Sequence, residues 1–169
     1  MATIISSLVK GAIAGGVGVW LMDRFTWYWY SHENTDTLVK ERHAQKGGRY
    51  APNAAGKHLT DTLGMELPQK QQYVAGRSVH YFMGIAPGAL YAICRHRMNK
   101  YGFLRGPLYG LGLFLVFDEI ITPALGYASG PFAYPWQAHA RGFFAHIILG
   151  TATELTISLL AEGTEIKKR

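Results

Sequence analysis

The sequence predicts an all-α fold in which four helices cross a membrane, within a single membrane domain of 169 residues. Three observations support this prediction. Apolar residues collect in four stretches of about 20 residues or more, enough to cross a bilayer as helices. Glycines recur at four-residue spacing inside these stretches, as in membrane helices that pack closely. Basic residues gather mainly at the ends of the apolar stretches, where they specify membrane topology.

The first predicted span covers about residues 4–30. Its apolar part, Ile4 to Met22, contains Gly11 and Gly15, a GxxxG pair that lets helix backbones approach closely. The aromatic run that ends at Tyr30 is typical of a membrane interface. The N-terminus lacks the basic start and the small-residue cleavage site of a signal peptide, so we expect the span to be retained.

Residues 31–72 form a polar loop of mixed charge. Within it, we expect a short helix over 35–46 that Gly47 and Gly48 end, and a second helix over 52–63. The loop is expected to lie on the membrane surface or on a partner protein.

The second, third and fourth spans cover about residues 73–94, 106–125 and 136–161. The second carries a stripe with four-residue spacing, which is Gly76, His80, Gly84 and Gly88. The fourth carries a similar stripe, which is Gly142, His146, Gly150 and Glu154. Residues four apart share one face of a helix, and a polar or small-residue face of a membrane helix has to pack against other helices.

Charge asymmetry predicts that both termini lie inside, with the long polar loop outside. The connection between spans two and three is basic, as is the C-terminus, whereas residues 126–135 carry no charge. We interpret the basic connection first as a topology signal, and second as a segment that faces anionic lipid head groups. Its basic residues are Arg95, Arg97, Lys100 and Arg105.

Alternation of the spans places nine ionisable residues from four helices in the outer half of the membrane. They are Asp23, Arg24, Arg77, His80, Asp118, Glu119, His139, Arg141 and His146. The simplest interpretation is that they neutralise one another and hold the helices together. Because Asp118 and Glu119 are adjacent, and so diverge by about 100° around a helix, we expect at most one of them to be central.

Three functional interpretations of this cluster compete with the structural one. Histidine and a perturbed carboxylate can titrate near neutral pH, so the cluster could relay protons or ions. His80 and His146 could instead ligate a b-type haem between two spans. The third interpretation is a metal site. Because no ligand motif of the HExxH kind is present, we expect no metal.

Lys10 and Glu154 are predicted to form an ion pair. Each lies about two turns from the inner end of its span, the first and the fourth. An unpaired charge at such a depth costs at least about 2.5 kcal/mol.

Several classes of function are disfavoured by the sequence. The net charge is +6, but the sequence shows no basic face interleaved with aromatic residues that could stack on bases. This argues against nucleic acid as a partner. Cys94 is the single cysteine, so no internal disulfide can form. No GxSxG motif is present, and Cys94 has no evident base nearby, so no catalytic residue is predicted and an enzyme is disfavoured.

Short motifs run through spans two to four, and they consist of Gly76, His80, the glycines between 106 and 112, Ile121, Pro123, Gly126, the Tyr134–Trp136 segment, His146 and Glu154. On these residues the three spans resemble the YagU-like family of bacterial inner-membrane proteins over about 90 residues. The resemblance implies a multi-pass protein of the bacterial inner membrane and no particular activity.

We therefore expect first a non-catalytic membrane protein, an accessory or structural subunit that docks to other membrane subunits or to itself. Proton or ion handling by the outer-half cluster is the second hypothesis. Electron transfer through haem is the third, and no cofactor is expected under the first two.

Overall fold

The computed structural model describes residues 2–166, and all regular secondary structure in this range is helical. The predicted all-α fold is confirmed. Three elements are long helices, which are α1 (Ala2–Ser31), α4 (Gln69–Cys94) and α7 (Trp136–Ile166). A fourth rod is composite, since α5 (Arg105–Leu113) continues through the π-helical segment η3 (Phe114–Ile121) into α6 (Thr122–Ala124).

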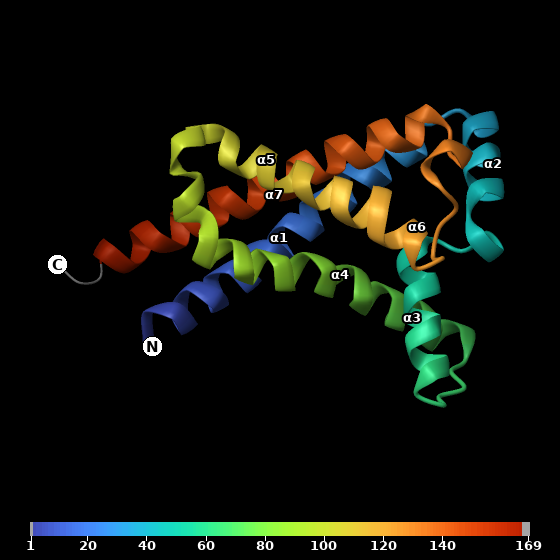
Figure 1. Cartoon of the computed structure of the whole chain (residues 1–169), viewed down its shortest axis with the longest axis horizontal. Helices are drawn as coiled ribbons and strands as arrows, with labels where there is room; N and C mark the ends of the chain where they lie inside the picture. Colours follow the sequence, from blue (N-terminus) through green and yellow to red (C-terminus); the bar gives the residue numbers. More distant parts are fainter. Residues whose placement is uncertain (1, 167–169) are drawn as a thin grey trace.

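The rods run back and forth along one long axis (Figure 1). Both termini lie at one end, together with the 3-10 segment η2 (Arg95–Leu104), and we call this the terminal end. The other end, which we call the loop end, carries α2 (Thr35–Ala44), α3 (Ala51–Thr62) and the connection from α6 to α7. Within η2 the chain turns back from α4 into α5, and Gly102 takes a positive φ of 53° there.

Glycine contacts hold the rods together. Gly11 and Gly15 of α1 lie against the backbone of Gly88 and Gly84 of α4. On the other side of α1, Gly18 packs against Leu149 and Thr153 of α7. These contacts explain the four-residue spacing, because only a residue without a side chain leaves room for a neighbouring backbone.

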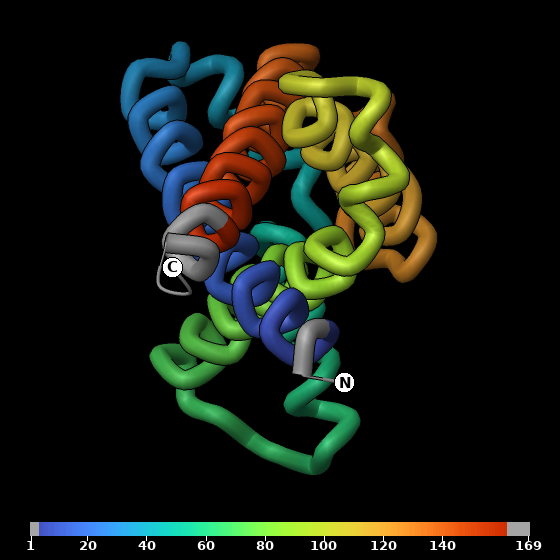
Figure 2. Tube along the Cα trace, turned by 90° about the vertical axis from the view of Figure 1, so that its left-hand side faces the viewer, coloured from blue at the N-terminus to red at the C-terminus, as the bar shows by residue number. Residues whose placement is uncertain are grey.

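The α5–α7 contact is built in the same way. Gly106 lies against Gly150, and Gly110 lies against the backbone of His146. The stripe predicted on the fourth span is therefore buried against α5, as expected. The view along the rods shows α1 and α7 crossing at the centre, with α4 and α5 to either side of them (Figure 2).

The polar loop forms a cap at the loop end. The side chain of Asn34 accepts a hydrogen bond from the Asp36 backbone N–H and so begins α2, while Gly47 and Gly48, both with positive φ, follow its end. Gly56 of α3 packs against Gly76 of α4. Both predicted loop helices are confirmed, and the cap packs on the protein's own rods.

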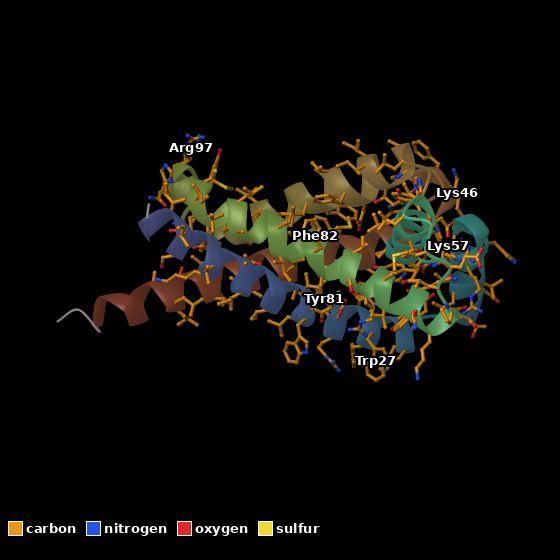
Figure 3. All side chains as sticks on the ribbon, turned by 90° about the horizontal axis from the view of Figure 1, so that it is seen from below. Trp27, Lys46, Lys57, Tyr81, Phe82 and Arg97 are labelled. Atoms are coloured by element: carbon orange, nitrogen blue, oxygen red, sulfur yellow. The ribbon has the colours of Figure 1, made fainter. Side chains whose placement is uncertain are left out.

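Three segments are long and apolar enough to cross a membrane, which are Ile4–Ser31, Gln69–Ala124 and Trp136–Ala161. The middle segment contains α4, η2 and the composite rod, so its 56 residues fold back on themselves. Large apolar side chains along the rods, including Ile13, Phe82, Val116 and Leu155, are exposed. Charged side chains gather toward the ends, as Arg97 at one end and Lys46 and Lys57 at the other illustrate (Figure 3). This distribution fits a membrane protein.

Candidate functional site: a polar cavity at the loop end

A cavity of about 1160 Å³ opens between the rods and the cap. Its walls come from the halves of α1, α4, η3 and α7 nearest the loop end, and from α2 and the start of α3. All nine residues of the predicted polar cluster line it, namely Asp23, Arg24, Arg77, His80, Asp118, Glu119, His139, Arg141 and His146. The structure thus brings together side chains that are up to 123 positions apart in the sequence.

His80 and Asp23 join α4 to α1 across one wall of the cavity. The His80 Nε2 atom lies 2.9 Å from Asp23 Oδ1. Because a carboxylate only accepts, Nε2 carries the proton. Arg77 Nη2 lies 3.9 Å from the other oxygen of Asp23, at the more exposed rim. Each charge at this wall therefore has a partner from a neighbouring helix.

His139 and Glu119 form a second pair, which joins α7 to η3. His139 Nε2 lies 2.8 Å from the carbonyl oxygen of Pro131, which can only accept, so Nε2 is the donor. The other ring nitrogen, Nδ1, lies 2.8 Å from Glu119 Oε1. A hydrogen bond at that second contact requires one further proton, on either the imidazole or the carboxyl group. Either position of that proton keeps His139 and Glu119 hydrogen-bonded.

His146 and Asp118 form a looser pair on α7 and η3. His146 Nδ1 donates to the Gly142 carbonyl oxygen at 2.9 Å, and Asp118 Oδ2 lies 3.7 Å from the same nitrogen. The Asp118 side chain is 44% exposed, and this surface faces the cavity. Asp118 is thus the most accessible carboxylate of the three histidine pairs, since those of Asp23 and Glu119 are 31% and 21% exposed.

Asp118 and Glu119 both line the cavity, and which of them is central stays a prediction. They still point to different histidines, His146 and His139, as adjacent residues on a helix must. Both lie in the π-helical segment η3, whose backbone bonds skip one residue more than in an α-helix. Single π-helical turns occur often at functional sites.

Arg141 binds the cap to the rods. Its guanidinium group makes a short ion pair with Glu41 of α2 and lies 3.7 Å from Glu33, over the ring of Tyr30. Arg141 is only 4% exposed, so these carboxylates offset a charge that is removed from water. Sequence reasoning missed Glu33 and Glu41, and their spacing gives no signal, because Arg141 is 100 positions beyond Glu41.

Aromatic side chains complete the wall near the cap. Tyr50 is half accessible, but the open part faces the cavity, and protein surrounds the ring. Burial, together with the nearby carboxylates of Asp118 and Asp23, raises the pKa of the Tyr50 phenol. Burial likewise raises the pKa of Tyr134. Both phenols are therefore neutral at physiological pH and can serve as hydrogen-bond donors.

Glu154 is the centre of a second polar cluster, which lies near the terminal end and apart from the cavity. It accepts hydrogen bonds from Arg95 Nη2 at 2.5 Å and Tyr91 at 2.7 Å, and Arg105 Nη2 lies 2.6 Å away. The ion pairs of Glu154 in the described residues are thus with Arg95 and Arg105, and the pairing with Lys10 stays a prediction.

The basic connection is only partly a lipid-facing segment. Arg97 and Lys100 are exposed, as that interpretation requires. Arg95 and Arg105 are not, because both guanidinium groups turn inward to Glu154. The expectation that all four basic residues face lipid is wrong, because a buried carboxylate attracts the two at the ends of the segment.

The bis-histidine haem stays a prediction, and the contacts of the two histidines argue against it. A haem would need the ring nitrogen of His80 that the hydrogen bond to Asp23 occupies. His146 is held at the tight α5–α7 contact, where its backbone meets Gly110. Within the described residues, no group of three or more His, Cys, Asp or Glu is arranged to hold a metal ion.

Comparison of the chain with family models, curated proteins and solved structures finds no match. The resemblance to the YagU-like family therefore stays a prediction, and the functional argument depends on the cavity.

Proposed function

We propose that this chain is a multi-pass protein of the bacterial inner membrane that handles protons through the polar cavity. The observation that carries the proposal is that three histidine–carboxylate pairs line one cavity. Histidine is the side chain whose unperturbed pKa lies closest to physiological pH, so such pairs can take up and release protons there. The sequence favours an accessory subunit first, and the cavity is the reason for preferring its second hypothesis.

The arrangement supports stepwise movement of a proton within the cavity. His139 and Glu119 are hydrogen-bonded to each other at the cavity, and Asp118, the neighbour of Glu119 in the chain, faces the cavity. His146 lies beside Asp118 on the adjacent rod. Ionisable residues inside membrane helices are costly and mark proton relays and ion paths, which favours a functional role over simple packing.

In the proposed topology, four spans cross the membrane with both termini inside, and the loop end faces outward. The cavity then opens toward the outer half of the membrane under the cap formed by α2 and α3. The C-terminal basic residues Lys167–Arg169, which support this orientation in the sequence, lie outside the described residues.

Proton flux in proteoliposomes tests the function. With a pH-sensitive dye inside, a pH gradient should relax faster in vesicles that hold the protein. Asp118→Asn and His146→Ala should reduce this flux to the rate of empty vesicles, because each removes one member of the accessible pair. Glu66→Gln removes an exposed carboxylate outside the cavity and should leave the flux unchanged. Unchanged flux in both cavity variants would rule out proton handling by this cluster.

A further inference from the structure

We propose that Asp118 is the binding site of an organic monocation, which enters the cavity in exchange for a proton. This inference rests on the proposed proton-handling function and names the class of substrate.

Accessibility singles out Asp118 among the carboxylates of the cavity. Asp23 is bonded to His80, Glu119 to His139, and Glu41 to Arg141. Asp118 instead turns 44% of its side-chain surface to the cavity, and His146, at 3.7 Å, donates its Nδ1 proton to the Gly142 carbonyl. Its open side can therefore receive a ligand.

The titratable groups that face Asp118 are three histidines, one carboxyl group and one phenol. They come from each element around it, and are His146 and His139 of α7, His80 of α4, Glu119 of η3, and the Tyr50 phenol before α3. The arginines of the cavity are engaged elsewhere, since Arg141 pairs with Glu41, Arg77 lies near Asp23, and Arg24 lies over the Trp20 ring. A bound cation would thus meet a negative carboxylate without a competing guanidinium group.

The shape of the site favours an organic cation over a small metal ion. Gly142 lets the Phe114 ring pack closely beside Asp118, because a Cβ atom at this position would lie 2.9 Å from the ring and 3.6 Å from Asp118 Oδ2. Aromatic rings line the same cavity, including Phe114, Phe117 and Tyr50. Aromatic faces attract cations, and they also cover the apolar part of an organic one. A volume of about 1160 Å³ accommodates a molecule of that size.

Exchange follows from the cost of charge in a membrane. A lone carboxylate in a membrane cavity is unfavourable. Either a proton on the carboxyl group or a monocation beside it restores neutrality, and the two cannot neutralise the same charge at once. Each cation that binds to the protonated site therefore displaces one proton into solution.

Equilibrium dialysis of the purified full-length protein in mild detergent tests this with tetraphenylphosphonium as the probe. We expect saturable binding that weakens about tenfold for each pH unit below the carboxyl pKa, since one proton competes with one cation. Asp118→Asn should weaken binding by about 30-fold or more, and Asp118→Glu should restore much of it. Glu66→Gln, outside the cavity, should bind like the wild type.

Several outcomes would overturn the cation site. The first is equal binding of the probe by a folded Asp118→Asn variant. The second is displacement of the probe by tetraphenylborate, an anion of the same shape. The third is no binding of the probe to folded wild-type protein. Folding is checked by size-exclusion chromatography and helical circular dichroism. Proton flux that requires Asp118, together with no tetraphenylphosphonium binding, would overturn this inference and leave the proposed function standing.

Discussion

Replacing Glu154 with alanine should lower the free energy of unfolding by about 3–5 kcal/mol, the usual cost of removing one partner from a buried ion pair. The Glu154 side chain is 9% exposed and holds two guanidinium groups, those of Arg95 and Arg105. Without it, both positive charges stay at the junction of α4, α5 and α7 with no carboxylate to offset them. Tyr91 also loses its acceptor.

The measurement is denaturant unfolding of the purified protein in mild detergent, followed by circular dichroism. Arg97→Ala is the matched control, because Arg97 belongs to the same basic connection but is exposed. Its effect should stay within about 0.5 kcal/mol. Equal, small changes in the free energy of unfolding for the two variants would show that the polar cluster around Glu154 does not hold the terminal end together.

Adding one methyl group at Gly110 should destabilise the protein by about 1–3 kcal/mol, the range for an overpacked core. A Cβ atom at Gly110 would collide with the backbone carbonyl of His146 and lie 3.2 Å from the backbone nitrogen of Gly150. Backbone atoms cannot turn aside as a flexible side chain can. The Gly110→Ala variant must therefore push α5 away from α7, the helix that carries His146.

Gly112 offers a control on the same helix. A Cβ atom there meets nothing within 4 Å, so Gly112→Ala should be neutral or stabilising by up to about 1 kcal/mol, as alanine favours the helix. Thermal unfolding of both variants in the same detergent compares them. If Gly110→Ala were as stable as Gly112→Ala, the close α5–α7 contact would be contradicted.

The helices could be predicted from the sequence because their signals are local. Four-residue spacing of Gly142, His146 and Gly150 depends only on the helix period, and the structure buries that stripe as predicted. The convergence of the nine polar residues could also be predicted. Successive spans alternate in direction, so the distance of a residue from the end of its span gives its depth, and residues at the same depth come close together. Gly47 and Gly48 likewise signalled the end of a loop helix.

The ion-pair partners of individual charged residues could not be predicted, because they depend on how the connecting segments fold over the rods. The cap helix α2 reaches over the cavity and gives Glu41 to Arg141, and the sequence gives no local sign of that contact. Glu154 selects Arg95 and Arg105 because the turn at η2 brings both guanidinium groups to α7. The π-helical geometry at Asp118 and Glu119 was not predicted either, because we find no signal for it in the sequence.

The account depends on a water-accessible cavity inside a bundle that lipid surrounds, and thiol labelling at two adjacent positions tests this directly. Phe117 lines the cavity, whereas Val116, one residue away and so at nearly the same depth, is 45% exposed and lies outside it. In a Cys94→Ala background, Phe117→Cys and Val116→Cys would be treated in liposomes with a membrane-impermeant thiol reagent on both sides. We predict rapid labelling of Phe117→Cys and little labelling of Val116→Cys, because lipid covers the latter. Rapid labelling of Val116→Cys, or none of Phe117→Cys, would contradict the account.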